Sequence, residues 1–184
     1  MCNNFNKKFL DEAAKASKDQ NIDNVDSTPN KHEFMDEAIQ AAIMGLEANE
    51  GGPFGCVVVK DGIIVGRGNN KVTSTNDPTA HAEVLAIKDA CNNLSSFQLE
   101  GCVIYASSEP CPMCLGAIYW ARPDKVYFGC NHEDAAKIGF DDEFIYKEIQ
   151  LPIEKRSIPF EKFARNKALV AFEKWEDKEN KIEY

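Results

Sequence analysis

The chain has 184 residues, a length that usually forms one domain, and 43% hydrophobic with 28% charged residues is ordinary for a globular protein. No apolar run approaches the roughly 18 residues that a membrane-spanning helix needs. The net charge is −9 and no segment is rich in Lys and Arg, which argues against nucleic acid as main partner and favours a small-molecule substrate. Residues 1–31 are polar and weakly patterned, so we expect a flexible extension ahead of one domain over residues 32–184.

Hydrophobic periodicity predicts the elements of this domain. Apolar residues at helical spacing from Met35 to Leu46 predict an amphipathic helix, and two apolar runs around Asp61-Gly62 predict a β-hairpin over residues 54–68. Further along we expect a helix over 80–90, a strand over 102–106, a helix over 113–121, a strand over 126–130 and a last helix over 168–178, anchored by Phe172 and Trp175. Residues 160–163 favour no single state. The order α-β-β-α-β-α-β-α predicts an α/β fold in which helices cover a sheet.

Two short motifs offer a metal site. His81-Ala82-Glu83 is followed by Pro110-Cys111-Pro112-Met113-Cys114. One imidazole and two thiolates favour Zn²⁺ over Mg²⁺ or Ca²⁺, and three protein ligands leave the fourth tetrahedral position for water, as in catalytic sites. Proline suits the first turn of a helix, so both cysteines are predicted at a helix N-terminus, where thiolates are favoured.

Glu83 completes the chemistry because it is a carboxylate beside the metal that does not bind it. Zinc lowers the pKa of bound water to about 7, and the resulting hydroxide can attack an electron-poor ring carbon. Glu83 can then carry protons to the ring nitrogen and to the leaving amine. A lone Cys-x-x-Cys is more often a redox pair or part of a structural zinc site, but His-x-Glu followed by Pro-Cys-x-x-Cys is the signature of zinc-dependent base deaminases.

With these motifs the chain resembles the cytidine-deaminase-like zinc superfamily, and within it the bacterial guanine deaminases, over residues 33–184. The resemblance rests on the segments 51–55, 69–70, 76–83 and 109–123, and most specifically on 139–148, 158–160 and Glu183-Tyr184. It implies a three-layer α/β/α sandwich with a mixed central sheet, and a homodimer whose C-terminal tail is swapped between subunits. The implied reaction is hydrolytic deamination of guanine to xanthine and ammonia, in purine salvage or catabolism.

The resemblance also implies contacts with the purine. Asn70 would hydrogen-bond the base, Asp142 would accept hydrogen bonds from its edge, and the remaining contacts would come from Phe54, Trp120, Ala82 and, in the partner subunit's site, Tyr184. The residues alone leave plainer interpretations open. Phe54 and Trp120 also suit core positions, Asn70 a turn, and Asp142 a solvated helix start.

Other functions share parts of this pattern. A tRNA-specific adenosine deaminase has the same zinc motif, but the negative charge and the segment 140–148 argue against it. A non-catalytic zinc protein needs no acid–base group, so the presence of Glu83 argues against that class. Deaminases of cytosine, guanosine or triazines reuse the same centre and stay open. The odd number of cysteines, seven, and the polar N-terminus predict a cytoplasmic protein. We assign no function to His32 or His132.

Overall fold

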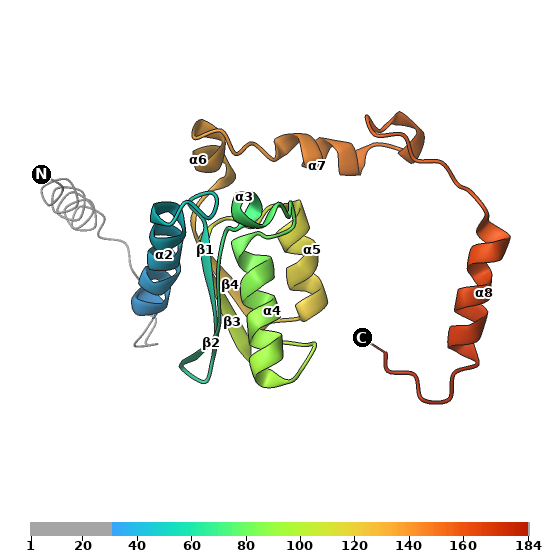
Figure 1. The fold of residues 1–184 in the computed structure, drawn as a ribbon, viewed down its shortest axis with the longest axis horizontal. Coiled ribbons are helices and arrows are strands. Elements are labelled where there is room, and N and C mark those ends of the chain that lie inside the picture. Colours follow the sequence, from blue (N-terminus) through green and yellow to red (C-terminus); the bar gives the residue numbers. More distant parts are fainter. Residues whose placement is uncertain (1–30, 184) are drawn as a thin grey trace, which may run out of the picture.

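The computed structural model of the chain describes residues 31–183 (Figure 1). The expected extension therefore lies, apart from Lys31, outside the described residues, and so does Tyr184. The elements are α2 (Lys31–Glu47), β1 (Gly55–Lys60), β2 (Ile63–Asn69), α3 (Val72–Thr75), α4 (Ala82–Leu94), β3 (Cys102–Ser108), α5 (Pro112–Ala121), β4 (Lys125–Cys130), α6 (His132–Lys137), α7 (Glu143–Gln150), a 3-10 turn η1 (Ile153–Lys155) and α8 (Arg165–Glu176).

The four strands form one sheet in the order β2-β1-β3-β4. Strand β1 is antiparallel to β2 and β3, whereas β3 and β4 are parallel, so the sheet is mixed as predicted. The hairpin between β1 and β2 is confirmed: Asp61 and Gly62 have φ of 51° and 76°, the left-handed conformation that a tight two-residue turn requires.

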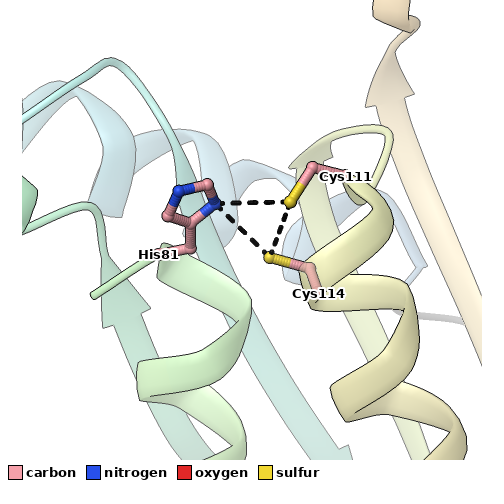
Figure 2. Close-up of side chains that lie close together, drawn as sticks. All are labelled: His81, Cys111 and Cys114. Atoms are coloured by element: carbon pink, nitrogen blue, oxygen red, sulfur yellow. Dashed lines mark hydrogen bonds between the residues drawn. The ribbon is translucent and has the colours of Figure 1, made fainter. Parts of the chain in front are cut away.

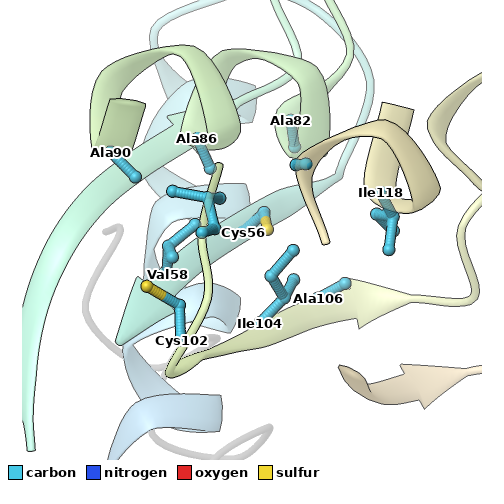
Figure 3. Packing of buried hydrophobic residues seen from close by; sticks show 11 residues of the cluster. Cys56, Val58, Ala82, Ala86, Ala90, Cys102, Ile104, Ala106 and Ile118 are labelled. Atoms are coloured by element: carbon cyan, nitrogen blue, oxygen red, sulfur yellow. The ribbon is translucent and has the colours of Figure 1, made fainter. Parts of the chain in front are cut away.

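Helices cover both faces of the sheet. Helix α2 lies on one face, and α4 and α5 lie on the other (Figure 1). Side chains alternate along β1, so Cys56 and Val58 pack under α4 and α5 with Ile104 (Figure 3). Val57 and Val59 point the other way and pack under α2. Because β1 is buried on both faces, the three-layer α/β/α sandwich is confirmed.

Small residues bring α4 close to the sheet. The face of α4 that meets the strands consists of Ala82, Ala86 and Ala90, all buried. Glycine is required at position 68 of β2, because a Cβ there would overlap the carbonyl oxygen of Ala82. This close packing fixes where the N-terminus of α4, and with it His81, sits at the edge of the sheet.

The C-terminal part forms an arm that extends away from the sandwich (Figure 1). Phe172 and Trp175, predicted as the apolar anchors of the last helix, are 72% and 41% exposed, so they do not pack on the sandwich of their own chain. Helices α3 and α6 were not predicted, because each is too short for a clear apolar period, whereas α7 begins after Asp142, which suits a helix start. Residues 160–163 have no regular structure. Within the described residues, no helix combines the length and apolar character needed to cross a membrane.

Candidate active site

His81, Cys111 and Cys114 meet where helices α4 and α5 begin. His81 precedes the first turn of α4 and Cys111 that of α5, both with extended backbone, and Pro112 opens α5 as predicted. Figure 2 shows the three side chains turned toward one another. His81 Nδ1 lies 3.5 Å from each sulfur, and the two sulfurs are 3.5 Å apart. Bonds of about 2.0–2.3 Å in a tetrahedron separate such ligands by roughly 3.5–3.8 Å, so these residues fit Zn²⁺.

The thiols of Cys111 and Cys114 are hydrogen-bonded to one another. The hydrogen bond with Cys114, followed by the one with His81, lowers the pKa of the Cys111 thiol to about 4. The same Cys111–Cys114 bond, with burial and the nearby Glu83, raises the pKa of Cys114. A bound dication would favour the thiolate form of both cysteines. It would therefore lower the pKa of the Cys111 thiol and of the Cys114 thiol.

Glu83 is the second residue of α4 and is buried, with 7% exposure. Burial raises the pKa of its carboxyl group. Its carboxylate is not part of the group of three metal-ligand atoms. A buried carboxyl with a raised pKa beside a metal site is suited to take up and release protons during a reaction.

A cavity of about 670 Å³ opens over these residues. The sequence-predicted residues that line it are His81, Glu83, Cys111, Phe54, Asn70 and Asp142. The fold thus brings together side chains from five separate places in the chain. Volume and lining suit a flat aromatic molecule with a polar edge.

Asn70 has an orientation set by the backbone around it. Its Oδ1 accepts hydrogen bonds from the backbone N–H groups of Gly52 and Val72, each at 3.2 Å. A Cβ at Gly51 would overlap this oxygen, so glycine is required there. Since backbone N–H groups can only donate, the oxygen must face them and the amide Nδ2 is left as a donor.

Asp142 and two aromatic rings form another part of the wall. Burial, followed by the nearby Cys111, raises the pKa of the Asp142 carboxyl. Phe54 and Phe140 meet edge to face, with ring centres 4.9 Å apart and an angle of 88°. The cavity therefore offers a carboxyl group and an apolar aromatic wall in addition to the amide of Asn70.

Two predicted contacts lie elsewhere within the chain. Trp120 is 64% exposed and lines a separate hollow of about 260 Å³ with Ile87 and Phe97. It stands roughly 9 Å along α5 from Cys114, on the basis of 1.5 Å per residue. The side chain of Ala82 is buried in the core, so a contact with substrate would have to come from its backbone.

The structure adds cavity residues that the sequence analysis did not assign. Glu109, His132 and Phe140 all line the cavity. Glu109 Oε2 lies 3.0 Å from His132 Nδ1, and this hydrogen bond is the main cause that lowers the pKa of Glu109 and raises that of His132. A signal was present in the sequence: Glu109 and His132 each follow a predicted strand, and the carboxyl ends of parallel strands meet at one edge.

The chain is similar to proteins of a known family. The model of the cytidine and deoxycytidylate deaminase zinc-binding region matches residues 28–130. The guanine deaminase of Bacillus subtilis (strain 168) is 54% identical over 155 residues, which cover 84% of this chain and 99% of that protein. The X-ray structure of guanine deaminase from Bacillus subtilis is similar with a TM-score of 0.82 over the same shares of both chains. The tRNA-specific adenosine deaminase of Aquifex aeolicus (strain VF5) is 44% identical over 98 residues, 53% of this chain and 64% of that protein.

Proposed function

The chain belongs to the cytidine and deoxycytidylate deaminase family of zinc enzymes, and within it to the guanine deaminases, and we propose that it hydrolyses guanine to xanthine and ammonia in purine salvage or catabolism. The observation that carries the proposal is the cavity, which joins the His81, Cys111 and Cys114 site and the buried Glu83 to the polar and aromatic groups that a purine needs. The likeness to the tRNA enzyme covers 53% of the chain, whereas the likeness to guanine deaminase covers 84%.

When bound, zinc supplies a water that loses its proton near neutral pH. Glu83 takes that proton and passes it to the ring nitrogen beside the amino-bearing carbon, while the C–O bond forms. Glu83 then moves the remaining hydroxyl proton to the amino group, which leaves as ammonia, and the carbon becomes the carbonyl of xanthine. Burial of Glu83, which raises its pKa, matches the need to hold a proton between these two transfers.

Asn70 and Asp142 orient the base in this proposal. The Nδ2 of Asn70 donates to an acceptor on the purine edge, because its oxygen is taken by the backbone. Asp142, on another side of the cavity, accepts from a ring N–H. Phe54 supplies an apolar surface for the flat ring, and Ala82 contributes through its backbone.

Turnover of a panel of bases tests the substrate. The zinc-loaded protein should release ammonia from guanine much faster than from adenine, cytosine, guanosine or an adenosine-containing anticodon stem-loop RNA. The product should be xanthine, identified by its absorbance and mass. Comparable turnover of the RNA hairpin would transfer the assignment to the tRNA-specific deaminases, and the absence of turnover of any base by zinc-loaded protein would leave a non-catalytic zinc protein.

We further propose that the protein is a homodimer whose C-terminal arms are exchanged. The arm exposes many large apolar side chains, including Phe163 at 91% and Phe172 at 72%. The body of the sandwich exposes Tyr119 and Trp120 on α5, at 75% and 64%. Apolar groups of this size on two surfaces favour burial against a second chain. The contact of Trp120 with a base would then be made in the partner's cavity, and Tyr184 would close it.

Mixed dimers test the exchange. A Glu83→Gln chain has an inactive site but an intact tail, and a chain lacking residues 182–184 has an intact site but no tail end. Each alone should be inactive or nearly so while keeping its zinc. Refolded together they should regain activity, because one intact site receives one intact tail. Full activity of the shortened chain, a monomer by light scattering, or no recovery in the mixture would each contradict the proposal. We also propose a cytoplasmic location, which would keep the zinc-ligating Cys111 and Cys114 reduced.

A further inference from the structure

His132 and Glu109 form a pair at the cavity that the reaction described above does not use. Glu109 Oε2 accepts two hydrogen bonds from His132, one from the backbone N–H at 3.2 Å and one from ring Nδ1 at 3.0 Å. Their side chains are 56% and 32% exposed, for His132 and Glu109 respectively, and both line the cavity wall. Since a carboxylate oxygen accepts, Nδ1 carries the proton, so the pair fixes the rotation of the imidazole ring.

Glu109 lies on the same loop as the zinc ligand Cys111. Glu109 follows β3 and stands two residues before the zinc ligand Cys111. Its backbone N–H donates to the carbonyl oxygen of Cys130 at 2.8 Å, which extends the parallel pairing of β3 and β4. The carboxylate of Glu109 therefore projects from backbone that is held in register with the sheet.

His132 lies in the segment 131–142, which carries the cavity residues Phe140 and Asp142. His132 is the first residue of α6, and reciprocal hydrogen bonds between Asn131 and Asp134 fix the start of this helix. The chain then turns, with the N–H of Phe140 bonded to the carbonyl oxygen of Ala135 at 3.0 Å. This turn brings Phe140 and Asp142 to the cavity.

Few side-chain contacts hold residues 131–142 in place. Among the side chains of the described residues 31–183, Glu109 is the one outside residues 131–142 that forms a hydrogen bond with this segment. The ring of Phe140 also lies against Phe54 and Gly52. Helix α6 itself packs little against the sandwich and contains no buried residue. Within the described residues, the Glu109–His132 pair is therefore the side-chain hydrogen-bonded link between this segment and the sandwich.

We propose that His132 is a positioning residue for guanine deamination: it holds Glu109 and thereby fixes residues 131–142 against the loop that carries the zinc ligands. With the segment fixed, Phe140 and Asp142 stand ready for the purine before it arrives. Preorganisation of this kind lowers the cost of binding, so its loss raises KM more than it lowers kcat. The substrate in this statement rests on the proposed function, whereas the fixing of the segment does not.

The test compares substitutions that keep or remove one hydrogen bond. His132→Asn places an amide Nδ2–H where Nδ1–H stood, whereas His132→Ala removes the ring donor; both keep the backbone N–H. His32, exposed in the first turn of α2, supplies the matched control His32→Ala. Hydrogen exchange of the zinc-loaded protein without substrate should show amides 131–142 exchanging about three- to fivefold faster in His132→Ala, as expected for a largely exposed pair. His132→Asn and His32→Ala should exchange as the wild type does.

Kinetics give the second readout. His132→Ala should raise KM for guanine by about three- to tenfold with a smaller change in kcat and unchanged zinc content, and His132→Asn should restore KM. On a Glu109→Ala background, His132→Ala should add little, because the two residues act as one unit. Should His132→Ala fail to fold, His132→Gln, whose donor stands one bond further out, takes its place.

Several results would overturn the proposal. These are unchanged exchange in residues 131–142, equal losses for Asn and Ala at position 132, additive effects with Glu109→Ala, or loss of zinc from His132→Ala. Failure of the proposed function looks different: the wild type would not convert guanine, while the exchange measurement would still judge the pair.

Discussion

Asn70 provides the sharpest test of how the cavity recognises its substrate, because its two side-chain atoms have separate tasks. The oxygen accepts two backbone N–H groups at 3.2 Å, and the residue is 5% exposed. The nitrogen is proposed to donate to the purine. Two substitutions separate the tasks: Asn70→Ala removes both atoms, whereas Asn70→Asp keeps the oxygen and replaces the donor by an acceptor.

The magnitudes follow from these contacts. Asn70→Ala leaves two nearly buried N–H groups without their acceptor, at about 1 kcal/mol or more each, so the free energy of unfolding should fall by about 2–3 kcal/mol. For a domain of this size Tm should drop by about 4–10 °C. Asn70→Asp keeps both bonds, so its loss of stability should stay within about 1 kcal/mol.

The effect on catalysis should run in the opposite order. With Asn70→Asp, an anionic acceptor faces an acceptor of guanine, and kcat/KM should fall at least about 100-fold, or about 2.7 kcal/mol. Asn70→Ala only leaves the purine acceptor unpaired, and kcat/KM should fall about 10- to 100-fold. Steady-state kinetics with guanine, thermal unfolding and zinc content give the three measurements. Guanine turnover by Asn70→Asp at nearly the wild-type kcat/KM would refute the assigned orientation of the amide, and an Asn70→Ala protein as stable as the wild type would refute the role of its oxygen.

The other predictions concern the metal, the proton carrier and pH. Glu83→Gln should keep about one zinc per chain and lose at least about 100-fold in kcat, since the geometry stays and proton transfer is lost; near-full activity would contradict the mechanism. Cys114→Ala should release zinc, measured by metal analysis, together with activity, and retention of one zinc per chain would show that Cys114 is not a ligand. The Glu109–His132 pair should stabilise the fold most between about pH 4.5 and 6.5. Because folding lowers the pKa of Glu109, its contribution to stability is full above about pH 4.5 and is lost as the pH falls through the folded pKa. Because folding raises the pKa of His132, its contribution is full below about pH 6.5 and is lost as the pH rises through the folded pKa. The Tm difference between wild type and His132→Gln should therefore shrink on both sides of this window, and a difference independent of pH would exclude the ion pair.

The zinc site could be predicted because its information is local. Pro112 suits the first turn of a helix, and Cys111 and Cys114, three residues apart, then face one another at the helix start. His81 and Glu83 likewise depend on the start of one helix. The hairpin at Asp61-Gly62 and the alternation along β1 are also short-range patterns, so the sheet and its two helical layers followed from the order of the elements.

The substrate side of the cavity depends on long-range packing. Asn70 and Asp142 are 72 positions apart, and neither carries a local pattern that distinguishes a ligand contact from a turn or a helix start. His132 looked like an ordinary surface residue until the parallel pairing of β3 and β4 placed it beside Glu109. Only the folded sheet, which brings the ends of these strands to one edge, decided that these residues face a single cavity.

By itself the sequence determined the reaction chemistry, because metal ligands and a proton carrier at fixed spacing within helix starts are specified by short-range geometry. The tertiary structure decided which polar groups surround the reacting base and where the apolar surfaces lie. Amphipathic patterning predicts that residues such as Phe172 are buried, but it does not specify against which surface, since the hydrophobic effect has no direction. The arm extends away from the sandwich and Trp120 is exposed. Which surface buries such apolar side chains is therefore decided by packing between elements that are far apart in the chain.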